Sequence, residues 1–138
     1  MSKKSFCLLI FIVIILILSY MLYVNFSNTL TRSEHEIREH ILTLIPIGTN
    51  MDETVNIIQD TEQWEIRRIS YDRGYYVTNS NRPSDSGREG MTVIGQSAIC
   101  ASIGNYGFIL ETYVVAYFGF DENHRLIDVH IRKDVDSL

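Results

Sequence analysis

The spacing of hydrophobic residues changes along the chain, and the first segment is hydrophobic throughout. Residues 6–24 form a nineteen-residue run without a charged side chain. With a rise of ~1.5 Å per residue, a helix of this length spans the roughly 30 Å hydrocarbon core of a bilayer. A helix also satisfies its own backbone hydrogen bonds in that environment. We therefore predict a transmembrane helix over Phe6–Val24, which is also the predicted contact with the membrane.

The flanks of this run predict how it is used. It is longer than the apolar segment of about 7–15 residues in a signal peptide, and bulky residues follow it instead of a small-residue cleavage site. We therefore favour an uncleaved anchor, with a cleaved signal peptide as the alternative. Lys3 and Lys4 precede the run, and the first charge after it is Arg32. The positive-inside rule then predicts a single-pass cell-membrane protein with a cytoplasmic N-terminus and residues 27–138 outside.

Two short segments after the run have helical spacing. Ser33 and Glu36 have the spacing of a capping box, and isoleucines and leucines then recur at helical intervals up to Pro46. These signals predict a helix over 34–44. Asn50 and Glu53 repeat the capping spacing, and a second helix is predicted over 51–60. Its predicted buried face consists of Met51, Val55 and Ile58.

From Trp64 onward the period of the pattern is two, as expected for strands. A slip in the alternation predicts a bulge near 67–68, and Asp72-Arg73-Gly74 predicts a hairpin turn. The segment 108–120 is apolar on both faces, which is typical of a central strand covered on both sides. In the last strand Ile127, Val129 and Ile131 are predicted to be buried, with His130 on the opposite face. The predicted strands cover 64–71, 75–78, 95–104, 108–120 and 127–132.

Helices followed by a run of strands indicate an α+β fold. The prediction is an N-terminal transmembrane helix followed by two short helices packed on one antiparallel sheet of four or five strands. Residues 1–26 are then the anchor with a short cytoplasmic tail, 27–33 a polar linker, and 34–138 one extracytoplasmic domain.

The charge of the external part limits its partners. The ten Lys and Arg residues beyond the tail are outnumbered by all seventeen Asp and Glu, a net charge of −7. This balance argues against nucleic acid and anionic lipid as partners. It is explained either by simple solubility or by a surface complementary to a basic partner protein.

The sequence contains no strong catalytic or metal-binding motif, so we predict no enzyme, cofactor or metal. Asp128 and His130 project from the same face of the last strand and have the residue types of an acid–base pair. Solvent-facing polar residues of an ordinary strand have the same pattern, and we favour that interpretation. Cys7 and Cys100 cannot form a disulfide, since one lies in the predicted membrane helix and the other in a predicted strand.

Tyrosines are the strongest compositional hint of binding. Tyrosine suits half-buried sheet positions, so packing is the default interpretation, but it is also enriched at protein–protein contacts. Tyr75 and Tyr76 point to opposite faces of one short strand, so at least one is expected to be exposed. The polar loop 79–92 follows directly and carries two arginines. The candidate partner-binding residues are Tyr75, Tyr76, Arg82 and Arg88.

The helix start at Gly48, Thr49, Glu53 and Val55, together with the late strand pair 112–132, resembles the SmpA/OmlA-like envelope domains. It is also similar to domains of the β-lactamase-inhibitor-protein type. The resemblance covers residues 46–132 and implies a helical hairpin laid on an antiparallel sheet. It also implies action by binding other proteins in assembly, inhibition or immunity.

The chain departs from that pattern twice. The lipid-bearing cysteine of the SmpA/OmlA-like domains is replaced here by the anchor helix, and the glycine-proline turn after the second helix is replaced by Asp60–Trp64. We therefore expect a membrane-anchored protein-interaction module, of the immunity, inhibitor or accessory-subunit type. The alternative is a small-ligand sensor or binding domain, with its cleft between the sheet and the 79–92 loop.

Overall fold

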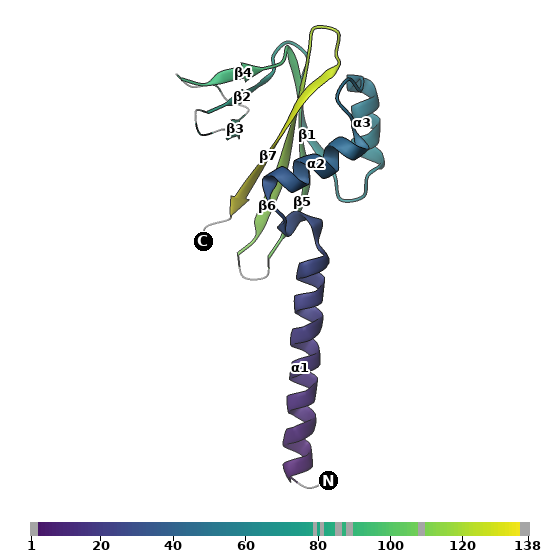
Figure 1. The fold of residues 1–138 in the computed structure, drawn as a ribbon, viewed down its shortest axis with the longest axis vertical. Helices are drawn as coiled ribbons and strands as arrows, with labels where there is room; N and C mark the ends of the chain where they lie inside the picture. Colours follow the sequence, from purple (N-terminus) through teal and green to yellow (C-terminus); the bar gives the residue numbers. More distant parts are fainter. Residues whose placement is uncertain are drawn as a thin grey trace.

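The computed structural model describes residues 3–78, 80, 82–84, 87, 90–107 and 110–135, and within the first helix the side chains of residues 5–24. One long helix, α1 (Lys3–Ser27), projects from a folded domain (Figure 1). Within it, Ser5–Val24 is long and apolar enough to cross a membrane, and none of this span is buried against the domain. A helix of this kind is compatible with an anchor or with a signal sequence.

The helices of the domain begin and end close to the predicted residues. A single 3₁₀ turn, η1 (Thr29–Thr31), leads from α1 into α2 (Glu34–Leu44), and α3 (Met51–Asp60) follows. The capping box of α2 is confirmed: Glu36 N donates to Ser33 Oγ, and Ser33 N donates to a Glu36 carboxylate oxygen.

The start of α3 is capped by Asn50, as predicted, but not through the predicted capping box with Glu53. The Asn50 side chain accepts a hydrogen bond from Asp52 N at 3.0 Å, and not from Glu53 N as a capping box requires. The buried face of α3 also differs by one position, because Thr54 and not Val55 is fully buried. Thr54 Oγ1 donates to Asn50 O, which satisfies its hydroxyl inside the core.

The strands form two antiparallel sheets, so the prediction of a single sheet is wrong. The larger sheet has the order β1-β5-β6-β7, and the smaller has the order β3-β2-β4. The strands of the larger sheet are β1 (Glu65–Ser70), β5 (Ser97–Tyr106), β6 (Thr112–Phe120) and β7 (Leu126–Val135). Those of the smaller sheet are β2 (Tyr75–Val77), β3 (Pro83–Ser84) and β4 (Thr92–Ile94).

The predicted hairpin at Asp72–Gly74 is wrong for the same reason. Strand β1 pairs with β5, and the chain then crosses to β2 in the other sheet. Gly74 passes so close to β4 that an added Cβ would lie 1.9 Å from Ile94 O. The glycine therefore permits a close crossing between layers and does not close a two-stranded hairpin.

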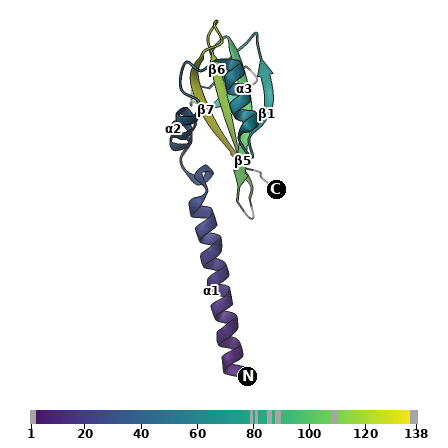
Figure 2. The same ribbon diagram turned by 90° about the vertical axis from the view of Figure 1, so that its right-hand side faces the viewer.

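The domain has three layers, which lie side by side in Figure 1. Helices α2 and α3 cover one face of the larger sheet, and the main hydrophobic core lies between the helices and this face (Figure 2). On part of the other face lies the smaller sheet, over a second cluster of buried residues. Strand β6 is buried on both faces, as predicted. The second cluster consists of Tyr75, Val77, Ala98, Cys100, Val115 and Tyr117.

Strand β7 corrects one predicted core residue. Val129 and Ile131 are buried, whereas Ile127 is 43% exposed. The register between β6 and β7 shifts here, because Phe120 pairs with Leu126 while Gly119 pairs with Asp128. Ile127 is thus the extra residue of a bulge, and Leu126 takes its place in the core.

Candidate functional site

Tyr75 lies between the smaller sheet and the larger sheet, where polar side chains meet. It is only 2% exposed, and its ring packs against Tyr117, with centroids 5.7 Å apart. Its ring also meets the imidazole of His130 edge-on at 5.6 Å. Tyr75 therefore fixes the smaller sheet to strands β6 and β7.

A chain of polar contacts extends from Tyr75 to the helical layer. The Tyr75 hydroxyl lies 2.7 Å from His130 Nδ1, and the same nitrogen lies 3.5 Å from Asp128 Oδ2. Asp128 Oδ1 accepts a hydrogen bond from Arg38 Nη2 at 2.9 Å, and Arg38 Nε donates to Val129 O. The four side chains thus connect α2, the edge strand β7 and the smaller sheet.

The protons in this chain follow from burial and charge. Burial, and then the negative charge of Asp128, raise the pKa of Tyr75. The hydroxyl therefore stays protonated and forms the hydrogen bond with His130 Nδ1, in which the tautomer of the imidazole decides which group is the donor. The Asp128–His130 contact is the longer of the two and becomes an ion pair only when the imidazole is protonated. The hydrogen bond to Asp128 raises the pKa of Arg38, so the guanidinium stays charged.

Asp128 and His130, weighed above as an acid–base pair, are therefore close together but already engaged. Asp128 also accepts a hydrogen bond from Val129 N at 2.8 Å, in addition to the one from Arg38. The His130 side chain is mostly buried, with 17% of its surface exposed. The arrangement is that of a partly buried polar network that connects layers.

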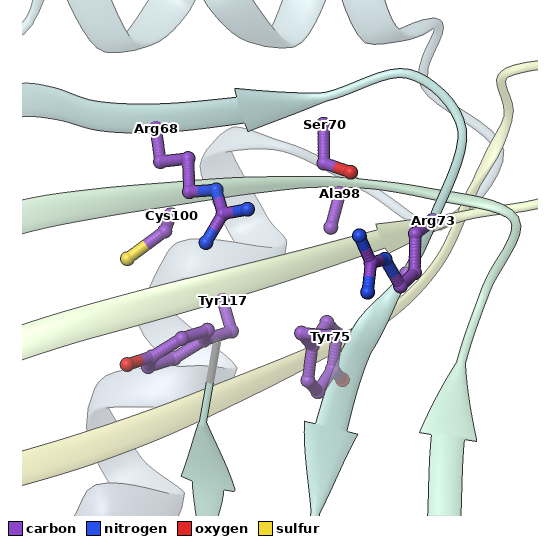
Figure 3. A pocket seen from close by; sticks show the side chains of 8 residues that line it. Arg68, Ser70, Arg73, Tyr75, Ala98, Cys100 and Tyr117 are labelled. Atoms are coloured by element: carbon purple, nitrogen blue, oxygen red, sulfur yellow. The ribbon is translucent and has the colours of Figure 1, made fainter. Parts of the chain in front are cut away.

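A groove opens on the other side of Tyr75, between the two sheets (Figure 3). Tyr75, Tyr117, Ala98 and Cys100 are buried and form its floor, while Arg68 and Arg73 are exposed. In Figure 3 both guanidinium groups point towards the space over the two tyrosine rings. The enclosed volume is only about 20 Å³. No carboxylate lines the groove among the residues that the structure describes.

The bulge in β1 puts one of these arginines in place. The register shifts between Ile66 and Arg68, so Arg67 is the extra residue. Ile66 packs on the helical side, and without the bulge Arg68 would lie on that side too. Instead Arg68 pairs with Cys100, which pairs with Tyr117, and all three line the groove.

The four candidate residues predicted from the sequence lie in different environments. Tyr75 is buried, and its hydroxyl is occupied by His130. Tyr76 is half-buried, and its hydroxyl accepts a hydrogen bond from Arg73 Nη1 at 3.3 Å. Arg82 is exposed, 4.0 Å from Asp134, and Arg88 lies outside the described residues. The structure thus brings Tyr75 into the groove but not Arg82.

The sequence did not predict that Arg68, Arg73 and Tyr117 lie together in one groove. The predicted bulge near 67–68 was the available signal for Arg68. The pairing of β1 with β5, which brings the groove together, has no local signal in the sequence.

Two larger cavities lie elsewhere. An open cleft of about 430 Å³ lies between α2 and β7, lined by Arg38, His35, Asp128 and His130 among others. A cavity of about 220 Å³ lies between η1, α2 and the loop before β1. Within the described part of the chain, no group of three His, Cys, Asp or Glu residues is arranged to hold a metal ion.

Comparison with known proteins gives no relative. No protein-family model, curated protein or solved structure matches the chain significantly. Any functional conclusion must therefore come from the chain's own residues.

Proposed function

We propose that this protein is a single-pass, membrane-anchored module that binds a partner protein outside the cytoplasm. The anchor is Ser5–Val24, the one described helix with the length and composition of a membrane span. Lys3 and Lys4 precede it, which favours a cytoplasmic N-terminus. An immunity or inhibitor protein, or an accessory subunit of an envelope complex, acts in this way.

The observation that carries the proposal is the arginine-rimmed groove between the sheets. Arg68 forms no ion pair with any residue that the structure describes. Arginine recognises carboxylates through two parallel hydrogen bonds and stacks on aromatic rings. The domain is acidic as a whole, so this groove is a local reversal of charge. We infer that the partner presents an acidic side chain here, in contrast to the basic partner protein that was one of the two explanations of the net charge.

The size of the groove favours a protein over a free small molecule. A volume of about 20 Å³ accepts the tip of one side chain, whereas sites for small ligands measure about 300–1,000 Å³. Strand β1 is also an edge strand, paired on one side with β5. An extended partner segment that pairs with β1 places alternate side chains beside Arg68 and Ser70.

A site-specific cross-linking experiment tests this proposal. A photo-reactive amino acid at Ser70, inside the groove, should capture a partner in membranes of the native host. The double variant Arg68→Glu/Arg73→Glu should lose at least nine-tenths of the adduct. Arg67→Glu is the control for location, because it makes the charge change of one of these two substitutions on the same strand as Arg68 but outside the groove. Equal adduct from all three proteins would refute the groove as the binding site.

The topology is tested separately with a reporter fused after Leu138. Activity of a reporter that works only outside the cytoplasm is expected. A fusion active only in the cytoplasm would contradict the proposed orientation.

A second candidate function, small-ligand binding, is favoured by the open cleft between α2 and β7. Its volume of about 430 Å³ falls within the range of ligand sites, and its lining is charged. His35→Ala removes a cleft side chain that lies outside the polar network described above. If His35→Ala abolishes the function of the protein and Arg68→Glu leaves it intact, small-ligand binding in this cleft is favoured over partner binding in the groove.

A further inference from the structure

The segment between the membrane helix and the domain is bound to the sheet. Asn28 Oδ1 accepts a hydrogen bond from Leu30 N and so caps η1. Leu30 packs against the main core, and an added Cβ on Gly104 would lie 2.8 Å from Leu30 Cδ1. Lys133 Nζ on β7 donates to Arg32 O. The linker is therefore held by β5 and β7, and the domain has a defined orientation relative to α1.

This orientation turns one end of the domain towards the membrane. In Figures 1 and 2 the β5–β6 hairpin points back along the molecule towards α1, and β7 ends on the same side in Figure 1. The apolar span ends at Val24, and Leu30 follows six residues later, at most ~12 Å further along the chain through the end of α1, extended Asn28 and the 3₁₀ turn. The headgroup layer is roughly 5–7 Å thick on each side of a bilayer. Leu30 thus lies just beyond the headgroups, and the β5–β6 hairpin, which points back towards α1, lies at their level.

The residues at this end suit the interface between lipid and water. Leu110 and Val135 are 50% and 59% exposed although they are apolar. Tyr106 is half-buried, and Lys133 Nζ lies 5.1 Å from its ring centre and 3.3 Å from its hydroxyl. Tyrosine is enriched at membrane surfaces, and lysine extends its charged group to the headgroups. The Glu111 carboxylate beside Leu110 is held by Asn105 and by the Tyr113 hydroxyl.

We propose that Tyr106, Leu110 and Val135 dock the domain onto the outer surface of the bilayer that holds α1. The inference rests on the proposed function, because it requires that α1 stays uncleaved. Apolar contact carries the docking, so zwitterionic lipid is sufficient and the acidic domain needs no anionic lipid. Tyr117 is five residues from Thr112 along β6, which places the groove ~17 Å further from the membrane. Docking thus presents the groove at a fixed height above the bilayer.

Tryptophan fluorescence of the full-length protein in phosphatidylcholine nanodiscs tests the docking. Trp64 is the only tryptophan, so Trp64→Phe provides a dark background. Leu110→Trp is the reporter and Val93→Trp, on the smaller sheet, is the matched control, since the native residues are 50% and 46% exposed. We expect lipids with brominated chains to quench position 110 at least threefold more strongly than position 93. We expect aqueous acrylamide to give the reverse order.

A second reporter, Val135→Trp, repeats the measurement on β7 in case Leu110→Trp does not fold. Equal acrylamide quenching at positions 110, 135 and 93, in nanodiscs that retain the intact chain, would overturn the docking and leave the proposed function in place. A chain that mass spectrometry finds cleaved after α1 would overturn both. Quenching at 110 and 135 by brominated lipid, with position 93 unaffected, supports the docking.

Discussion

Removal of the Tyr75 side chain should detach the smaller sheet from the domain without unfolding the larger one. Tyr75 joins the two sheets, because its ring lies against Tyr117 and His130 and its hydroxyl bonds His130 Nδ1. Gly119, which would place a Cβ 2.9 Å from the Tyr75 ring, leaves room for it on β6. The informative pair of variants is Tyr75→Ala and Tyr75→Phe.

The two substitutions should lower the free energy of unfolding by different amounts. Truncation of a buried aromatic side chain to alanine costs ~3–5 kcal/mol, because both its burial and its packing contacts are lost. Tyr75→Phe keeps the ring and removes the hydrogen-bond partner of His130 Nδ1, which costs ~1–3 kcal/mol. Small domains have a free energy of unfolding of only ~5–15 kcal/mol. The alanine variant should therefore lose the docked smaller sheet, whereas the phenylalanine variant should keep it.

Hydrogen exchange of the full-length protein in detergent micelles measures this directly. In Tyr75→Ala, amides of β2 and β4 should exchange at least a hundredfold faster, while those at the centre of β6 should keep most of their protection. Tyr75→Phe should show a much smaller change confined to β2. Equal acceleration throughout β6 would refute the view that the smaller sheet is a separable layer.

Three further outcomes are expected. Burial raises the pKa of Tyr75. The stability that the protonated hydroxyl contributes is therefore complete below the unfolded-state pKa of about 10 and is lost as the pH rises above that value. Above pH 10, urea titrations should show that the free energy of unfolding of the parent falls by about 1.4 kcal/mol per pH unit more than that of Tyr75→Phe. Ile58→Asp should abolish cooperative melting, whereas Val55→Asp, at a half-buried position, should only lower the melting temperature; the reverse order would contradict the observed face of α3. Gly104→Ala should destabilise by ~1–3 kcal/mol in thermal melts, because its φ of +129° suits glycine alone and an added Cβ meets Leu30; an unchanged melt would show that the linker is not held there.

The helices were predictable because their signals are local. Ser33 and Glu36 form the box that their spacing predicts, and α2 and α3 begin and end at the predicted residues. The bulge in β1 was predictable for the same reason, since the slip in alternation lies within five residues. The choice of Val55 over Thr54 as a buried residue failed because threonine can satisfy its hydroxyl on the preceding turn.

The assignment of strands to sheets was not predictable from alternation. Strand β1 is followed by a glycine turn and a second strand, which is the usual pattern of a hairpin, yet its partner is β5. Pairing depends on which faces bury together, and Ile66 and Ile69 both pack in the main core beneath the helices. The last strand shows the same limit, since the bulge at Ile127 responds to the register with β6 and leaves the alternation of the sequence unbroken.

Tyr75 and Tyr76 show why the site was the hardest part to predict. Alternation correctly places them on opposite faces of one strand, but it cannot decide which face another layer covers. That choice depends on His130, which lies 55 residues away and forms a hydrogen bond with the Tyr75 hydroxyl. His130 in turn lies beside Asp128, which is held by Arg38 from a helix 90 residues earlier. A tyrosine selected as an exposed contact is therefore buried by a polar network, and the groove beside it depends on arginines that only the three-dimensional pairing brings together.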